Sequence, residues 1–184
     1  MHTYTRTRAR CCPQAELRAL VTYAKDRGVR IIPELDVPAH TGGFRPLGHL
    51  VKYCDHNRSV LADHPQNIKV VQELLEELSA IFIDDVIHFG GDEVCKHGVC
   101  PTGCTFAQVH SFEKNVQRAI TALGRVPMGW NDVFSDPKAS PPNAALAGTI
   151  LQNWGKQPLQ TFAKSGFSSL DSEYTTMYLA QQVT

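Results

Sequence analysis

Apolar residues follow two different periods along this chain, and the two periods alternate. In some stretches they recur every three or four residues, which places them on one face of an amphipathic helix. Between these stretches lie short runs that are almost continuously apolar, as expected of strands buried on both faces. The predicted helices cover residues 13–27, 68–78, 106–120 and 158–164. The predicted strands cover residues 29–32, 86–87, 125–130, 149–154 and 167–170.

Helix and strand alternate about five times, and this order predicts parallel strands joined by helical crossovers. Two architectures share that order, the open doubly wound sheet and the closed (β/α)8 barrel. No glycine-rich phosphate loop follows an early strand, and ionisable residues follow several strands, so the barrel is favoured. We therefore expect an α/β fold, an incomplete (β/α)8 TIM-type barrel with about five βα units, formed by one partial catalytic domain over residues 1–184. An incomplete barrel has two unpaired apolar edges, so we expect missing flanking sequence or a partial gene product.

The charge balance limits the kinds of partner. The 184 residues include 18 basic and 18 acidic side chains, a formal net charge of zero. This balance argues against nucleic acid or an anionic membrane as the main partner. No apolar run approaches the roughly 20 residues that span a bilayer. Residues 1–10 lack the apolar segment of a secretory signal, so we expect either an intracellular protein or a start other than the native one.

The six cysteines leave three interpretations open. An even number suits disulfides in an oxidising compartment. The cluster of Cys95, His97, Cys100 and Cys104 also reads as a zinc hook, although its spacings differ from those of common structural zinc sites. Free structural thiols are the third interpretation. A disulfide in this loop is the favoured one.

Two predicted strands end in acidic residues. The run at 86–89 is followed by two glycines and then by Asp92 and Glu93. Acids at the carboxyl ends of barrel strands are well placed for acid/base chemistry. Successive side chains of a regular strand face opposite ways, so these acids share a site only if the chain bends at the glycines. The alternative is a surface turn whose acids serve solubility. The run at 29–32 leads to further ionisable residues: Glu34, Asp36 and His40.

These segments resemble the β-N-acetylhexosaminidases of glycoside hydrolase family 20. Residues 88–94, His-Phe-Gly-Gly-Asp-Glu-Val, are similar to the family's histidine–any–Gly-Gly-Asp-Glu signature. Residues 27–40 resemble its segment from Arg-Gly through Pro-Glu-hydrophobic-Asp to Pro-Gly-His, with Ala39 in place of the last glycine. The family's early strands and its final strand have no counterpart, and Ala180 stands where the family has Asp or Asn. Weaker similarities lie at residues 129–130, 152–154 and 178–179.

The resemblance implies a retaining, substrate-assisted glycoside hydrolase that removes terminal β-linked N-acetylglucosamine or N-acetylgalactosamine. Glu93 would be the general acid/base, protonating the leaving oxygen and later activating water. Asp92 would accept the N–H of the 2-acetamido group and stabilise the positive charge that develops on it. No metal and no organic cofactor is implied. The partners would be β-linked N-acetylhexosamine-containing glycans, with no nucleic acid and no membrane span.

Four further residues are predicted to contact the substrate, and an ordinary structural role remains open for each. His40, in a strand-end loop, would hold the acid or the sugar. Trp130 and Trp154 each close a predicted strand and would form apolar walls for the sugar face and the acetamido methyl. Tyr178 would donate a hydrogen bond to the acetamido oxygen. Three other ionisable residues are expected to be structural rather than catalytic: His88, Glu34 and Asp36.

Two rival functions remain open. One is a non-catalytic carbohydrate-binding remnant, which the absent strands and Ala180 favour. The other is a metal-dependent hydrolase that uses histidines and cysteines around Cys95. The resemblance favours a lysosomal or secreted location and is compatible with a homodimer.

Overall fold

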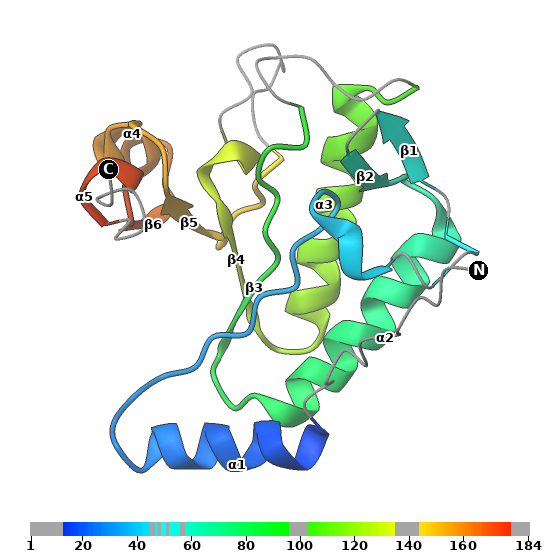
Figure 1. Ribbon diagram of the computed structural model, residues 1–184. Helices are drawn as coiled ribbons and strands as arrows, with labels where there is room; N and C mark the ends of the chain where they lie inside the picture. The colour runs from blue at the N-terminus through cyan, green and yellow to red at the C-terminus, as the bar shows by residue number, and fades with distance from the viewer. Residues whose placement is uncertain are drawn as a thin grey trace, which may run out of the picture.

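The computed structural model describes residues 13–44, 47, 49–50, 52–55, 58–95, 103–134 and 144–177. In these ranges the chain forms a parallel sheet with helices packed against it (Figure 1). The sheet has four strands whose order in space is their order in the chain. They are β3 (Val86–His88), β4 (Val126–Trp130), β5 (Ile150–Asn153) and β6 (Ser168–Asp171). All their pairings are parallel, as the alternation of helix and strand predicts.

The predicted helices all form, within a few residues of the expected bounds. Local chemistry explains the ends of the helix at Phe106–Ala122. Thr105 and Gln108 make a capping box at its start, and Gly124, at φ 72°, follows its end. Among the described residues, no helix combines the length and the hydropathy that a bilayer crossing requires. The helices are α1 (Gln14–Lys25), α2 (Pro65–Ile81), α3 (Phe106–Ala122), α4 (Leu159–Lys164) and the short α5 (Tyr174–Met177).

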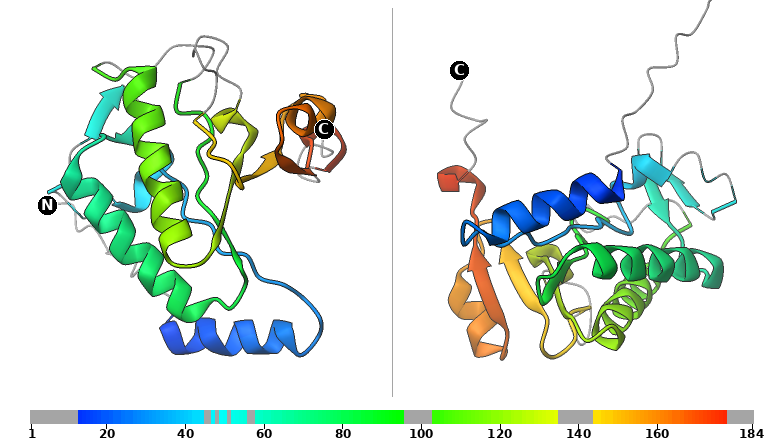
Figure 2. Two further views of the ribbon diagram at one scale, coloured as in Figure 1. Left: turned by 180° about the vertical axis from the view of Figure 1, so that it is seen from behind. Right: turned by 90° about the horizontal axis from the view of Figure 1, so that it is seen from below.

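The main hydrophobic core lies between the sheet and helices α2 and α3. Leu75 of α2 and Ile120 of α3 are fully buried, together with Phe89 after β3 and Leu151 of β5. Burying a side chain of this size contributes about 1.5–3 kcal/mol. Figure 2 shows α2 and α3 crossing beside the sheet, with α1 packed against α2. This packing fixes the strands whose carboxyl ends carry the acids.

The strand expected at residues 29–32 is absent, and that prediction was wrong. Parallel pairing with β3 begins only at Pro33, whose carbonyl oxygen accepts a 2.9 Å hydrogen bond from the His88 N–H. The ladder continues through Leu35 N to His88 O and Val37 N to Phe89 O, at 2.9 and 3.0 Å. The physical reason is register: Glu34 lies opposite His88, so only Ile32 of that run lies opposite β3, which starts at Val86, and residues 29–31 have no strand beside them. The chemistry-bearing segment is therefore extended, but it starts later than the apolar run suggests.

The loop between α1 and α2 contains structure that the apolar pattern does not predict. It holds a 3-10 turn and an antiparallel hairpin, with Tyr53 opposite Val60. The hairpin strands are short and rich in charged and hydroxyl residues, so they lack the long apolar run of a buried strand. The end of the second strand is anchored to the rest of the chain, where Leu61 N donates to Pro38 O at 2.9 Å. These elements are η1 (Thr41–Phe44), β1 (Lys52–Asp55) and β2 (Arg58–Leu61).

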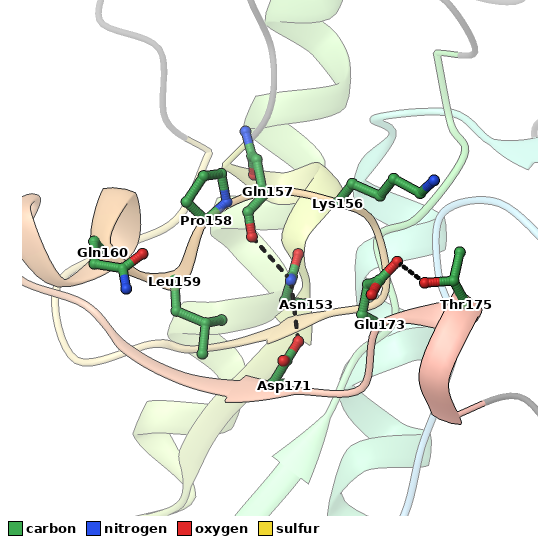
Figure 3. A pocket seen from close by; sticks show the side chains of 9 residues that line it. All are labelled: Asn153, Lys156, Gln157, Pro158, Leu159, Gln160, Asp171, Glu173 and Thr175. Atoms are coloured by element: carbon green, nitrogen blue, oxygen red, sulfur yellow. Dashed lines mark hydrogen bonds between the residues drawn. The ribbon is translucent and has the colours of Figure 1, made fainter.

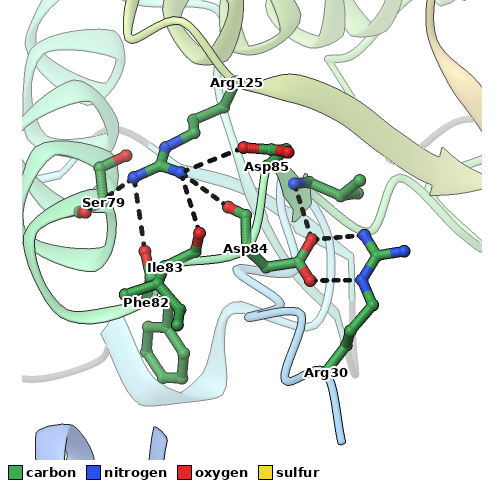
Figure 4. A network of polar contacts seen from close by, with 8 residues as sticks. Arg30, Ser79, Phe82, Ile83, Asp84, Asp85 and Arg125 are labelled. Carbon is green, nitrogen blue, oxygen red and sulfur yellow. Dashed lines mark hydrogen bonds and ion pairs between the residues drawn. The ribbon is translucent and has the colours of Figure 1, made fainter. Parts of the chain in front are cut away.

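Two arginines, Arg30 and Arg125, join segments at the amino ends of the strands (Figure 4). The candidate catalytic acids follow the other, carboxyl end of β3. Arg30 binds the Asp84 carboxylate with two nitrogens, at 2.7 and 2.8 Å, and this contact holds the pKa of Asp84 below its usual range. Arg125 donates to the carbonyl oxygens of Ser79 and Asp84, at 3.2 and 2.9 Å. It therefore satisfies carbonyls that the end of α2 leaves without helical partners.

Candidate active site

The chain turns sharply after β3, and this turn brings the two predicted acids together. Gly90 and Gly91 have φ angles of 74° and 89°, and Glu93 itself has φ 52°. These left-handed conformations end the strand alternation that would point successive side chains to opposite faces. As a result, His40 Nε2 lies 3.3 Å from Asp92 Oδ2 and 3.6 Å from Glu93 Oε2. Both carboxylates therefore converge on one imidazole.

Asp36 lies beside this group: one of its carboxylate oxygens is within 4.8 Å of a side-chain atom of His40 and of Asp92. Burial, followed by the charge of Asp92, raises the pKa of Asp36 to about 8. Burial also raises the pKa of Asp92, whereas His40 opposes that shift. Both shifts favour a proton held within the pair formed by Asp36 and Asp92.

Trp130 is fixed by groups from two neighbouring segments. Its backbone N–H donates to Gly90 O at 2.9 Å, which attaches the end of β4 to the turn that carries the acids. Its indole N–H donates to Glu34 Oε1 at 3.0 Å, and its ring meets the His88 ring edge-on at 4.8 Å. The contacts with His88 and Trp130 hold the pKa of Glu34 below its usual range. Glu34 and His88 thus act as supports for an aromatic residue, in keeping with their predicted structural roles.

Trp154 is fixed from the turn after β4, the 3-10 segment η2 (Asn131–Val133). Its backbone N–H donates to Asn131 Oδ1 at 3.0 Å, and its indole N–H donates to Asp132 Oδ2 at 2.6 Å. The other oxygen of Asp132 accepts the Glu93 backbone N–H at 3.2 Å. Sequence reasoning missed Asn131 and Asp132. The available signal was their position directly after a strand-closing Gly-Trp pair.

A comparison with known protein families identifies the family of the chain. The family model described as glycosyl hydrolase family 20, catalytic domain, matches residues 3–184, nearly the whole chain. The chain belongs to glycosyl hydrolase family 20. The resemblance drawn from the two strand-end motifs is thereby confirmed.

Curated family 20 relatives are longer than this chain. A β-hexosaminidase of Emericella nidulans is 36% identical over an alignment of 201 positions, which covers 89% of this chain and 32% of the relative. β-Hexosaminidase subunit A1 of Dictyostelium discoideum is 27% identical, over 85% of this chain and 32% of the relative. The chain therefore spans about a third of the length of the curated relatives it matches.

Solved family 20 structures share the fold. A family 20 β-N-acetylglucosaminidase superposes with a TM-score of 0.71 at 20% identity, over 90% of this chain and 39% of that one. A β-N-acetylhexosaminidase from Bacteroides fragilis also gives 0.71 at 20% identity, over 88% and 35%. The predicted α/β architecture, an incomplete barrel, is confirmed by these likenesses and by the parallel sheet.

Five of the six site residues predicted for this family 20 chain lie within the described residues. Asp92, Glu93 and His40 meet directly, as given above. Trp130 and Trp154 close β4 and β5 and are bound to the acid-bearing turn through Gly90 and Asp132. Tyr178 and the neighbouring Ala180 lie outside the described residues, so the role predicted for Tyr178 stays a prediction.

A metal in this region would find its ligands among the same residues. Asp36, His40 and Asp92 each offer one ligand atom, and these atoms lie within 4.8 Å of one another. The metal-dependent rival instead uses histidines and cysteines around Cys95, and of these His97 and Cys100 lie outside the described residues. Cys95 is disulfide-bonded, which removes its thiolate, and burial raises the pKa of the free Cys104 thiol to about 11. Of the cysteines of this loop that the structure describes, Cys95 and Cys104, neither therefore offers the ionised thiol that a zinc site needs.

A separate cavity of 580 Å³ opens at the carboxyl ends of β5 and β6 (Figure 3). Asn153, the residue before Trp154, forms its wall and donates to Asp171 Oδ1 at 3.2 Å. Neither Asp92 nor Glu93 lines this cavity.

Proposed function

We propose that this chain carries the acid/base centre of a β-N-acetylhexosaminidase, which releases terminal β-linked N-acetylglucosamine or N-acetylgalactosamine with retention of configuration. The observation that carries the proposal is the convergence of Asp92 and Glu93 on His40. Two carboxylates held at one point can divide the tasks of acid/base transfer and charge stabilisation. Membership of family 20 supports this assignment.

Asp92 has the form that the acetamido-orienting role requires. Its Oδ2 faces His40, whereas its Oδ1 is buried and has no hydrogen-bond partner among the described residues. A buried acceptor without a donor costs about 1–3 kcal/mol. The N–H of a bound 2-acetamido group would supply that donor. The negative charge would then stabilise the oxazolinium-like cation that forms as the acetamido oxygen attacks the anomeric carbon.

Glu93 is assigned the proton transfers. In the first step its carboxyl proton moves to the glycosidic oxygen, the bond from that oxygen to the anomeric carbon breaks, and the acetamido oxygen forms the new bond. In the second step Glu93 takes a proton from water as the water oxygen attacks the same carbon, and the bond from the acetamido oxygen to that carbon breaks. Two inversions give net retention. The Glu93 side chain is 29% exposed, so a leaving group and a water molecule can both reach it.

The test compares an aryl β-N-acetylglucosaminide with the matching aryl β-glucoside. Substrate assistance requires the acetamido oxygen, so we expect the first to be hydrolysed at least about 1,000-fold faster. Equal rates on the two substrates would overturn the proposal, because a carboxylate nucleophile would then be acting.

A non-catalytic carbohydrate-binding protein is the second candidate. The partly buried Trp130 and Trp154 favour it, because indole rings stack on sugar faces whether or not a bond is broken. The two tryptophans would then report N-acetylglucosamine binding by fluorescence in a protein without turnover of the aryl glycoside.

The compartment is assigned on chemical grounds. Disulfides persist mainly in oxidising compartments, and Cys95 is disulfide-bonded. A lysosomal or secreted location is therefore proposed.

A further inference from the structure

One carboxylate, that of Asp132, binds two segments of the candidate site at once. Its Oδ1 accepts the Glu93 backbone N–H at 3.2 Å, and its Oδ2 accepts the Trp154 indole N–H at 2.6 Å. Glu93 follows β3 and Trp154 follows β5, and these strands are separated by β4. Asp132 itself lies in η2, directly after β4. A single side chain therefore joins the ends of three strands.

We propose that Asp132 is a positioning residue, which sets the place of the Glu93 general acid/base relative to the Trp154 wall. This inference rests on the proposed function of Glu93. Asp132 contacts neither the reacting atoms nor the sugar in this assignment; it acts through the backbone of one residue and the indole of another.

The backbone of Glu93 shows why such a support is needed. Glu93 has φ 52°, a conformation that residues other than glycine rarely adopt and that costs about 1–2 kcal/mol. A hydrogen bond from its N–H to a carboxylate is charge-assisted and offsets such a cost. Without that bond the turn after Gly91 has less to hold its shape, and the Glu93 side chain loses its direction. A shift of about 1 Å in a catalytic group is enough to reduce a rate 100-fold.

The same geometry explains why an acid is needed at this position. Two N–H donors meet two acceptor oxygens, and both bonds form only with a carboxylate. Asparagine has one acceptor oxygen, so Asp132→Asn must lose one of the two bonds and place its NH2 against an N–H. Burial raises the pKa of Asp132, whereas the Trp154 and Glu93 donors favour its charged form. The other ionisable groups that face it are Glu93 and Asp92.

The first test needs no enzymatic activity. The chain has two tryptophans, and each indole N–H donates to a different carboxylate: Trp154 to Asp132, and Trp130 to Glu34. The pKa of Asp132 is raised and that of Glu34 is lowered, so in NMR the Trp154 indole resonance should move at a higher pH than that of Trp130. Asp132→Asn should abolish the Trp154 step and leave the Trp130 step intact. A wild-type Trp154 resonance that does not titrate overturns the inference.

The second test is a double-mutant cycle on an aryl β-N-acetylglucosaminide. Asp132→Asn should lower kcat about 10- to 100-fold, with a smaller effect on KM. Trp154→Phe keeps a smaller aromatic ring and removes the N–H that Asp132 accepts. The fold-reduction in kcat of the double variant should therefore be smaller than the product of the reductions of Trp154→Phe and Asp132→Asn. Trp130→Phe is the matched control, because the Trp130 indole N–H binds Glu34 instead of Asp132. The reductions in kcat of Trp130→Phe and Asp132→Asn should therefore multiply in the double variant.

The two tests separate the failures. If the reductions in kcat of Asp132→Asn and Trp154→Phe multiply in the double variant, the inference is overturned, even when the wild-type protein is fully active. A protein that shows the Trp154 step but hydrolyses no N-acetylglucosaminide overturns the proposed function, while the step still supports Asp132 as the group that holds Trp154.

Discussion

The carboxylate of Asp36 lies directly against the backbone of Gly90, so that a β-carbon at position 90 would overlap Asp36 Oδ1. Gly90 also has φ 74°, which disfavours any other residue. The close approach allows Asp36 to sit beneath the turn that carries Asp92 and Glu93. Gly90 is therefore required for two reasons. The turn needs its positive φ, and the Asp36 carboxylate occupies the place of a β-carbon.

The substitution Gly90→Ala tests this relationship. The backbone strain alone costs about 1–2 kcal/mol, and the overlap with Asp36 adds to it, so we expect a loss of about 3 kcal/mol or more in the free energy of unfolding. Gly28→Ala is the matched control, because Gly28 has φ 70° and no atom within 4 Å of the added carbon. It should lose only the strain. Urea denaturation measures both, and equal losses at the two positions would contradict the steric argument.

The raised pKa of Asp36 predicts a stability that falls as pH rises. The folded state keeps the Asp36 proton up to about pH 8, whereas the unfolded state releases it near the ordinary carboxyl value of about 4. Folded protein therefore binds more protons between these limits, and the free energy of unfolding decreases across the window. Asp36→Asn keeps the shape without the titration and should flatten the decline between pH 5 and 8, roughly the window set by these values. Thermal unfolding at each pH measures the slope of stability against pH. The same slope in Asp36→Asn as in the wild type would mean that Asp36 is ionised in the folded protein.

Arg125 offers a stability prediction far from the acids. Its guanidinium donates to several carbonyl oxygens near the end of α2, and a lysine could reach only some of them. We expect Arg125→Lys to lower the free energy of unfolding by about 1–3 kcal/mol. The control is Arg118→Lys, since the exposed Arg118 donates to Asn115 on its own helix and to no other group among the described residues. Denaturation curves that lose the same amount for both variants would show that charge alone accounts for Arg125.

The sequence predicted most of this fold because helix formation depends on local signals. The periodic apolar positions of α2 and α3 and the stop at Gly124 are visible without tertiary contacts. The error at residues 29–32 arose because Val29 and Ile32 read as buried, yet they are 58% and 38% exposed. Which apolar residues of a run become a strand depends on the register of the neighbouring strand, and no single run contains that information.

The same division applies to the candidate site. Asp92 and Glu93 were found because glycines and adjacent acids form a contiguous motif. Asp132 was missed because its importance comes from two partners that lie 39 and 22 residues away along the chain. Such a contact leaves no local pattern. The convergence of Asp92 and Glu93 could be stated only as a condition on the backbone, which the φ angles of Gly90, Gly91 and Glu93 then satisfy.

Substitutions at the two acids should separate their roles. Glu93→Gln keeps the size and loses the proton, so turnover of substrates with poor leaving groups should fall about 100- to 10,000-fold, and far less for activated aryl leaving groups that need no protonation. Asp92→Asn should instead weaken the preference for acetamido sugars, because its NH2 presents a donor where the acetamido N–H needs an acceptor. Rates for two leaving groups and for the acetamido and plain sugar pair, measured in each variant, give the assignment. If Glu93→Gln affected both leaving groups equally, or if Asp92→Asn kept full selectivity, the proposed division between the two carboxylates would be wrong.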